Sequence, residues 1–328
     1  MQSNRKQTGG IRSAVHTAWA RWLKHVVTLL LFSVVASLLF SLIRHMDWQA
    51  VVETLRGYSP SLVIAGVGIT AASFVVFSSY DLLGKWYTGH PLPMTQVLPL
   101  AFVCYAFNLN LGAWVGGIAL RYRLYTQFGL SVATVTRVLS VSLTTNWLGY
   151  MLVAGALFAL GIIELPPRWH ISTLGLQLAG AGLLVTCLSY LLACRYSRRR
   201  VWHWREHDIV LPSLRLALLQ LLLGAANWSL MAALVYLLLP EGVFYPTVLA
   251  ILLVSSIAGV VTHIPAGLGV LEAVFIAMLQ HQLAASEIVA ALIGYRALYF
   301  LLPLVVACVM YLFLERWSKR NRTLASKR

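Results

Sequence analysis

The chain has 328 residues, of which 59% are hydrophobic and 11% are charged, and its formal net charge is +15. Soluble globular domains carry about 25% charged residues, so this composition excludes an ordinary soluble protein and indicates a polytopic membrane protein. The Lys and Arg residues gather in short segments beside apolar runs, which is the positive-inside pattern and argues against nucleic acid as a partner.

Six full membrane-spanning helices are predicted from the continuous apolar runs, at 26–43, 61–83, 131–160, 174–194, 213–239 and 288–314. Two more apolar segments, 96–128 and 246–283, are interrupted by small residues. The basic segment 1–25 precedes the first span, which we expect to be retained and not cleaved as a signal peptide. The predicted fold class is therefore an all-α polytopic membrane protein.

Counting basic residues decides how the two interrupted segments cross. If both return to the side that they entered from, 21 Lys and Arg lie in cytoplasmic segments and three lie outside. If the first crossed once, 17 would lie outside and seven inside. The positive-inside rule rejects the second arrangement, so we expect two re-entrant helical hairpins and cytoplasmic N- and C-termini.

This topology divides the chain into two halves of opposite orientation, the layout of many transporters. The first inverted-repeat half is 26–163. An outer loop, the fourth span and a basic cytoplasmic loop occupy 164–212, and the remainder of the second half, with its re-entrant segment, is 213–314. A basic cytoplasmic tail, 315–328, completes the chain.

The first hairpin places two arginines close to its chain reversal. Gly112, Gly116 and Gly117 permit the reversal, and Arg121 and Arg123 follow about one helical turn later. A guanidinium matches phosphate oxygens, although residues two apart do not share a helical face, so at most one should face a cavity. Alternatively, both arginines extend to the cytoplasmic rim and only set topology.

Two more charged residues belong to the spans on either side of this hairpin. Asp81 lies near the cytoplasmic end of the second span, where it can pair with Lys85 or with an arginine of the hairpin. Arg137 begins a span rich in hydroxyl and amide side chains, which indicates either helix packing or the wall of a polar cavity. We therefore count both charges as candidate headgroup contacts.

The second hairpin is predicted from a break in the apolar run 248–279. Pro265 removes a backbone donor, and Gly267 and Gly269 permit unusual dihedral angles, so one helix should end near His263 and another should begin after Gly269. Broken backbone is not tolerated in contact with lipid, so this break must be buried in protein or line a wet cavity.

A carboxylate and an arginine follow the second break. Glu272 lies one turn into the second helix, and Arg296 lies within the last span. Ionisable groups at such depth are costly unless they have partners. We expect Glu272 to be the protein partner of Arg296, with a lipid phosphate as the alternative.

These motifs resemble the lysylphosphatidylglycerol synthase transmembrane-region family, in its stand-alone enterobacterial inner-membrane branch. The resemblance depends on Ile-Pro-Ala-Gly-Leu-Gly-Val-Leu-Glu-Ala at 264–273, on Gly116-Gly117 with the following arginines, and on Tyr295-Arg296. It implies a protein of the bacterial inner membrane that moves or handles a phospholipid. Fourteen residues follow the last span, so we expect no synthase domain and no requirement for an aminoacylated lipid.

The leading functional hypothesis is a flippase-like transporter of an anionic headgroup, such as phosphatidylglycerol, cardiolipin or another lipid phosphate. Arg121, Arg123 or Arg296 would receive the phosphate, and Glu272 and Asp81 would pair with them in the empty site. We expect no enzyme activity, cofactor or metal, because the ten acidic residues are scattered and the four cysteines lack metal-ligand spacing. The alternatives are a non-transporting scaffold for a lipid-synthesis enzyme, and a lipid-modifying membrane enzyme.

Overall fold

The computed structural model describes residues 48–162, 172–197, 201–204, 207–262 and 269–325. The predicted first span, the N-terminal segment and the break residues His263, Pro265 and Gly267 therefore lie outside the described residues. Residues 47–328 form one compact unit, separate from residues 1–46. All statements on packing concern that unit.

The described residues are all-α apart from one short β-hairpin. Within the described ranges, six helices are long and apolar enough to cross a membrane: Pro60–Thr88, Met94–Leu111, Val132–Ala159, Thr173–Tyr196, Leu214–Leu238 and Ala285–Trp317. Five of them coincide with predicted spans. The sixth is the first limb of the interrupted segment 96–128, which is 18 residues long and therefore about 27 Å in length.

Serine caps begin most of the long helices. The helices α3 (Pro60–Thr88), α6 (Val132–Ala159), α7 (Thr173–Tyr196) and α8 (Leu214–Leu238) each follow a serine in extended conformation. In each case the serine hydroxyl accepts a hydrogen bond from the backbone N–H three residues on, as with Ser59 and Leu62 at 3.3 Å. This bond satisfies a helix-start donor that has no intrahelical partner. A short helix, α2 (Trp48–Gly57), precedes α3.

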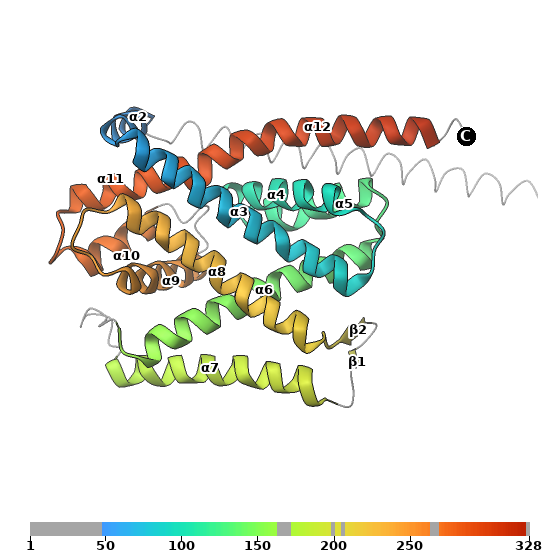
Figure 1. The fold of residues 1–328 in the computed structure, drawn as a ribbon, viewed down its shortest axis with the longest axis horizontal. Coiled ribbons are helices and arrows are strands. Elements are labelled where there is room, and N and C mark those ends of the chain that lie inside the picture. Colours follow the sequence, from blue (N-terminus) through green and yellow to red (C-terminus); the bar gives the residue numbers. More distant parts are fainter. Residues whose placement is uncertain (1–47, 163–171, 198–200, 205–206, 263–268, 326–328) are drawn as a thin grey trace, which may run out of the picture. The chain divides into compact units, whose positions relative to one another are not determined.

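The first interrupted segment forms a helical hairpin. Helix α4 (Met94–Leu111) ends at Gly112, whose φ of 83° suits glycine, and the chain returns as the π-helix η1 (Ala113–Ala119) and α5 (Leu120–Gln127) (Figure 1). The returning limb lies directly on α4. A Cβ atom at Gly116 would lie 2.2 Å from the carbonyl oxygen of Phe107, so only glycine fits there.

The second interrupted segment pairs α9 (Tyr245–Thr262) with α10 (Val270–Leu279). The chain then continues as α11 (Ala285–Tyr295), the π-helix η4 (Arg296–Leu301) and α12 (Leu302–Ala325) (Figure 1). Pro303 explains the π-helical turn, because its ring would clash with the carbonyl four residues earlier in a regular α-helix.

The two halves share one order of elements: a helix, a helical hairpin and another helix. The first half reads α3, α4–η1–α5 and α6, and the second reads α8, α9–α10 and α11–η4–α12. The inverted repeat and the re-entry of both hairpins remain predictions.

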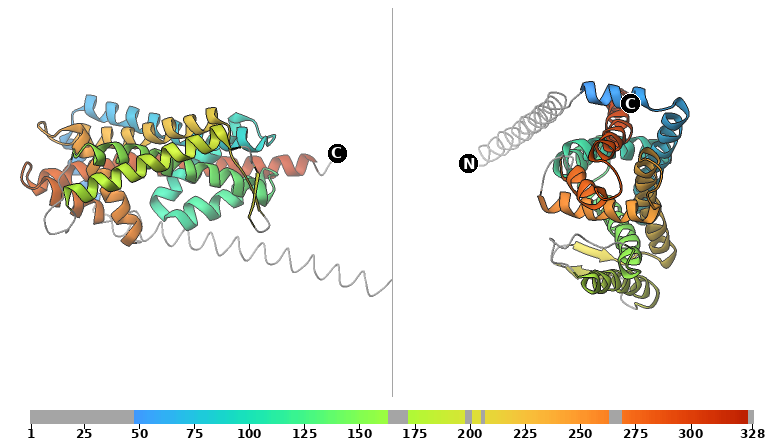
Figure 2. Two further views of the ribbon diagram at one scale, coloured as in Figure 1. Left: turned by 90° about the horizontal axis from the view of Figure 1, so that it is seen from below. Right: turned by 90° about the vertical axis from the view of Figure 1, so that its left-hand side faces the viewer.

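Close helix crossings hold the described unit together. Helix α8 packs on both α3 and α6, and α7 lies against α6 at one edge of the bundle (Figures 1 and 2). Gly149 and Gly224 meet where α6 crosses α8, and a Cβ atom at Gly149 would lie 2.1 Å from the Gly224 carbonyl carbon. Such backbone approach is typical of packing between membrane helices.

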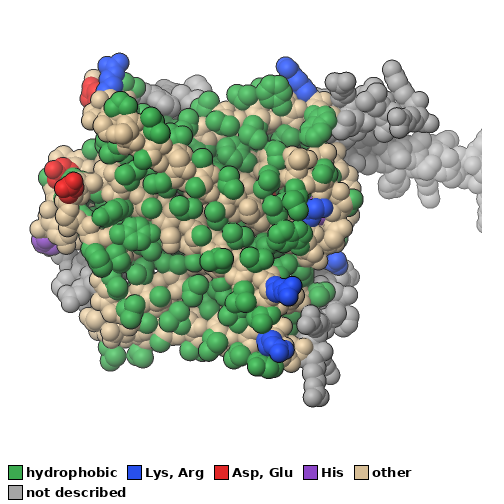
Figure 3. All heavy atoms as spheres, viewed as in Figure 1, with side chains coloured by type: hydrophobic (Ala, Val, Ile, Leu, Met, Phe, Trp, Pro, Cys, Tyr) green, Lys and Arg blue, Asp and Glu red, His purple; other side chains and the backbone are tan. Residues whose placement is uncertain are grey.

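The surface is largely hydrophobic, as lipid contact requires. In Figure 3 hydrophobic side chains cover most of the visible face, with several Lys and Arg side chains along the right-hand edge. A short antiparallel hairpin, β1 (Val201–Trp204) and β2 (His207–Val210), connects α7 to α8. The sequence predicted only a basic loop there. The hydroxyl of Tyr87 donates to the Val210 carbonyl at 2.6 Å, which ties β2 to α3.

Candidate binding site

A buried ion pair joins the first hairpin to α3. Asp81 is 0% exposed, and Nη2 of Arg121 lies 3.1 Å from its Oδ1 atom. Tyr125, one turn further along α5, donates its hydroxyl proton to Asp81 Oδ2. Of the two partners considered for Asp81, the structure places Arg121 against it, whereas Lys85 donates to the His90 carbonyl at 2.9 Å.

This ion pair leaves hydrogen-bonding capacity unused. The guanidinium is close to Asp81, but its N–H is not aligned on Oδ1, so that oxygen accepts no hydrogen bond within the described chain. The Nε atom of Arg121 is buried and also lacks a partner there. Buried polar atoms without partners are costly and rare. The pair is therefore electrically balanced while its hydrogen bonding is incomplete.

Arg123 faces another part of the molecule. Its Nη2 atom lies 3.3 Å from Oε1 of Glu315 on α12, and both side chains are mostly buried. The two arginines of α5 thus point to different neighbours, as residues two apart on a helix must. Arg121 joins α5 to α3, and Arg123 joins it to the last helix.

In the second ion pair, between Arg296 and Glu272, both hydrogen bonds are aligned. The Nε and Nη2 atoms of Arg296 donate to the two carboxylate oxygens of Glu272, at 2.7 and 3.1 Å. Glu272 Oε2 also accepts the backbone N–H of Gly269 at 3.0 Å, so the carboxylate caps α10 and binds Arg296 together. The Arg296 guanidinium further lies 5.7 Å from the centre of the Phe300 ring.

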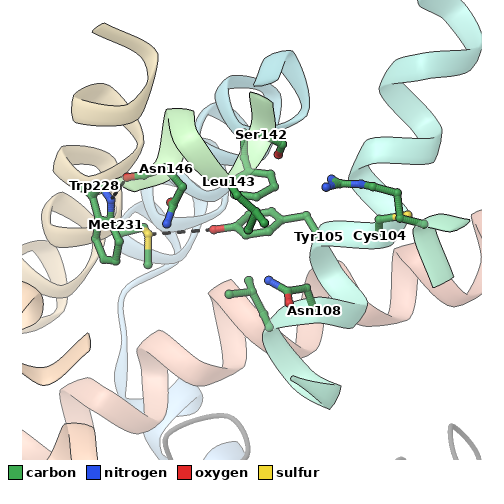
Figure 4. A pocket seen from close by; sticks show the side chains of 11 residues that line it. Cys104, Tyr105, Asn108, Ser142, Leu143, Asn146, Trp228 and Met231 are labelled. Atoms are coloured by element: carbon green, nitrogen blue, oxygen red, sulfur yellow. Dashed lines mark hydrogen bonds between the residues drawn. The ribbon is translucent and has the colours of Figure 1, made fainter. Parts of the chain in front are cut away.

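Arg121 also lines a cavity of about 170 Å³ between the first hairpin and helices α3, α6 and α8 (Figure 4). Its walls are formed by Phe77, Cys104, Tyr105, Asn108, Leu109, Arg121, Ser142, Leu143, Asn146, Trp228 and Met231. Arg121 is the only one of these residues whose side chain carries a charge at neutral pH. On the α6 side the wall is thin, because Leu143 is 48% exposed, so the cavity lies close to the lipid-facing surface.

A chain of buried hydrogen bonds leads from the cavity to the second half. The Tyr105 ring stacks on Phe77, and its hydroxyl lies 2.8 Å from the hydroxyl of Tyr299 in η4. Ser73 then joins Tyr299 to Asn227, at 2.7 and 2.8 Å. The amide of Asn110 on α4 also donates to the Phe300 carbonyl in η4 at 3.2 Å. The end of the first hairpin limb is thereby bonded to the π-helix that carries Arg296.

The remaining predicted residues are placed as follows. Arg137 is exposed on α6 and forms no ion pair or side-chain hydrogen bond with the rest of the described chain. Gly117 packs on Asn108, since a Cβ atom there would lie 2.6 Å from its Oδ1 atom. Among the residues placed in the structure, no group of three or more His, Cys, Asp or Glu side chains could hold a metal ion.

Comparison with known proteins gives the family. The model of the lysylphosphatidylglycerol synthase TM region matches residues 25–307, which is most of the chain and includes both hairpins. The chain belongs to this family. It is 45% identical to the inner membrane protein YbhN of Escherichia coli over 94% of this chain and 98% of that protein.

Two more distant relatives extend the lysylphosphatidylglycerol synthase TM family. A Synechocystis protein, slr0712, is 27% identical over 80% of this chain and 82% of its own length. The phosphatidylglycerol lysyltransferase of Staphylococcus haemolyticus is 21% identical over 89% of this chain, but the match covers 34% of that enzyme. The chain is thus a multi-pass membrane protein related to one region of a lipid-modifying enzyme.

Sequence reasoning missed most of the cavity wall of this family member. The polar side chains of Asn108, Asn146, Tyr105, Tyr299 and Ser73 are not among the residues predicted for the site. Their shared signal is a hydrogen-bonding side chain within a membrane helix, which requires a partner. The sequence alone cannot show which of them meet, because they come from helices far apart in the chain.

Proposed function

We propose that this protein is a phospholipid translocase of the inner membrane, with Arg121 receiving the phosphate of an anionic headgroup. One observation carries the proposal: a buried arginine with an unused Nε–H lines a cavity near the lipid-facing surface. A guanidinium with a free donor in a protein interior suits a phosphate oxygen. The family membership supports a lipid as the source of that phosphate.

The empty site explains how such an arginine is kept inside the membrane. Asp81 balances its charge and is itself held by Tyr125. When a phosphate enters, Arg121 donates to it and stays beside Asp81, so the carboxylate remains charge-balanced and no aligned hydrogen bond to Oδ1 is lost. Asp81 keeps the bond from Tyr125 throughout. Binding and release of the headgroup therefore leave no buried carboxylate unpaired.

The hydrogen-bond chain supplies a route by which the halves could respond together. Tyr105 belongs both to the cavity wall and to the chain that reaches Tyr299 in η4. Glu272 and Arg296 clamp η4 to α10. A headgroup that displaces Tyr105 would consequently act on the second hairpin. We place both termini on the cytoplasmic side in this proposal, from the distribution of basic residues.

The test uses the purified full-length protein in liposomes that contain acyl-labelled fluorescent phosphatidylglycerol, with leaflet-specific quenching. The wild type should exchange the label between leaflets. In the Arg121→Gln variant, lipid exchange should fall to the rate of protein-free liposomes, because the headgroup loses its cationic partner. Arg215→Gln is the matched control, because Arg215 is exposed on α8 and remote from the cavity wall, and it should exchange like the wild type.

A second variant separates loss of transport from loss of fold. Asp81→Asn combined with Arg121→Gln removes both charges and leaves no buried ion unpaired, so it should insert and elute as the wild type does while still failing to exchange lipid. Wild-type exchange by either Arg121 variant would refute the proposal. It would favour the alternative of a scaffold for a lipid-synthesis enzyme.

A further inference from the structure

The chemistry of the cavity wall extends to the kind of headgroup that fits. Building on the proposed function, we propose that the cavity selects unmodified anionic headgroups, such as that of phosphatidylglycerol, and rejects aminoacylated, cationic ones. A lysyl ester adds ammonium groups to the glycerol, and these groups need carboxylates or other acceptors once they leave water. Selectivity therefore depends on which charged groups the wall presents to an anion and to a cation.

The wall offers a charged partner to an anion and no charged partner to a cation. Arg121 is its single charged member, and the rest of the lining is neutral. Asp81, the nearest carboxylate, lies behind Arg121 and is not part of the wall. It is already bound by Arg121 and Tyr125. An ammonium group in the cavity would thus face a guanidinium of the same sign at short range, in surroundings that screen charge poorly.

The neutral polar groups of the wall suit a phosphate with an uncharged alcohol. The side chains of Asn108, Asn146 and Ser142 line the cavity and form no hydrogen bond within the described chain (Figure 4). Amides and hydroxyls both donate and accept, so they can satisfy phosphate oxygens and glycerol hydroxyls in turn. Phe77, Leu109 and Trp228 complete the wall with apolar surface that suits the carbon skeleton.

The volume of the cavity also favours a small, unmodified headgroup. At about 170 Å³ the cavity is smaller than the 300–1,000 Å³ of pockets that enclose whole drug-sized ligands. It has room for a phosphate and a short alcohol. A lysyl chain would have to displace wall residues, and the acyl chains must stay outside, beyond the partly exposed Leu143.

The experiment compares two lipids that differ only in the headgroup. Wild-type protein in liposomes is assayed in parallel with phosphatidylglycerol and lysyl-phosphatidylglycerol that carry the same acyl label. Phosphatidylglycerol should exchange between leaflets at least about tenfold faster, because like charges at short range are unfavourable at the intermediate dielectric of a protein. Equal rates, or faster exchange of the lysyl lipid, would overturn this selectivity and leave the proposed function standing. If neither lipid moves, both proposals fail.

A gain-of-function variant gives a second readout. Asn146→Asp places a carboxylate in the cavity wall, and should speed the lysyl lipid and slow phosphatidylglycerol, shifting their ratio by about tenfold or more. Ser140→Asp adds the same charge to the same helix at an exposed position outside the wall, and should leave the ratio unchanged. An unchanged ratio in Asn146→Asp, in protein that folds like the wild type, would contradict the assignment of this cavity.

Discussion

Two of the arginine–carboxylate pairs in the described part of the chain, Arg121–Asp81 and Arg296–Glu272, use the same chemistry in opposite ways. Arg121 and Asp81 lie in full burial, yet the N–H of Arg121 is not aligned on Oδ1 and its Nε has no partner in the described chain. Arg296 and Glu272 form two aligned hydrogen bonds, and Glu272 also caps α10 although it is 21% exposed. The ion pair with the more complete hydrogen bonding is thus the more exposed to solvent.

This difference distinguishes a ligand-binding ion pair from a purely structural one, which we call the clamp. A buried ion pair with saturated geometry resists the exchange of partners, because each lost hydrogen bond must be replaced. A buried pair with unused donors gains from a ligand that supplies the missing acceptor. The first pair is therefore the better candidate for headgroup exchange, and the second for holding η4 on α10. Arg296 belongs to the clamp in this interpretation, where the sequence alone left it equal to Arg121.

The largest expected effect comes from breaking the first pair on one side only. Arg121→Gln leaves Asp81 charged, buried and unpaired, which should lower the free energy of unfolding by about 3–5 kcal/mol. Adding Asp81→Asn to Arg121→Gln should restore most of the lost free energy of unfolding. Denaturant unfolding of the full-length protein in detergent measures both. A single variant as stable as the wild type would show that the Arg121–Asp81 pair contributes nothing to stability.

A smaller effect is expected at the second pair, where the chain offers a matched control. Glu287 caps α11 through the Ala284 N–H at 3.0 Å, the same bond that Glu272 makes to Gly269, but without an arginine. Glu272→Gln should cost about 1.5–3 kcal/mol more than Glu287→Gln, since only the former loses charged hydrogen bonds. The two variants are compared in the same unfolding assay. Equal losses would mean that Glu272 acts only as a cap.

The smallest expected effect is on the pH dependence of stability, and it concerns His90, which is close enough to Asp81 to interact with it. His90, in the loop between α3 and α4, is 5% exposed, and neither ring nitrogen has a hydrogen-bond partner in the described chain. Burial lowers its pKa from 6.5, Lys85 lowers it further, and Asp81 opposes the shift. Below about pH 6.5 the unfolded chain binds this proton before the folded one does, so stability falls as the pH drops.

His90→Gln should remove part of that loss of stability between pH 7 and pH 5. His281→Gln, at an exposed position after α10, serves as the control and should leave the pH dependence intact. Unfolding midpoints at several pH values give the comparison. Identical profiles for His90→Gln and the wild type would place the acid sensitivity elsewhere.

Much of the architecture follows from patterns that the sequence displays openly. Long apolar runs correspond to α3, α6, α7 and α8 within a few residues, since membrane helices must satisfy their own backbone. The first break lies at Gly112, and α10 begins at Val270, directly after Gly269. Proline and glycine act locally, so their effect is visible without knowledge of the neighbours.

The site was harder to predict, because it depends on contacts between distant segments. Asp81 had two plausible partners in sequence, and only packing shows that α5 covers it while Lys85 turns to the loop. Arg137 was also a candidate headgroup contact in sequence, yet it lies on the exposed side of α6. The β1–β2 hairpin also escaped prediction, since its basic segment indicated charge placement and carried no turn signal.

The contact of Gly116 with the Phe107 backbone has a mechanical consequence. No side chain separates α4 from its returning limb at that point, so the hairpin behaves as one stiff lever with Arg121 attached to it. Its ends, in contrast, are joined to the bundle through Gly89 and Gly129, which both have positive φ, at 68° and 89°. A motion of the whole hairpin would therefore pivot at these two glycines, carry Arg121 and Tyr125 together, and leave the hairpin itself unbent.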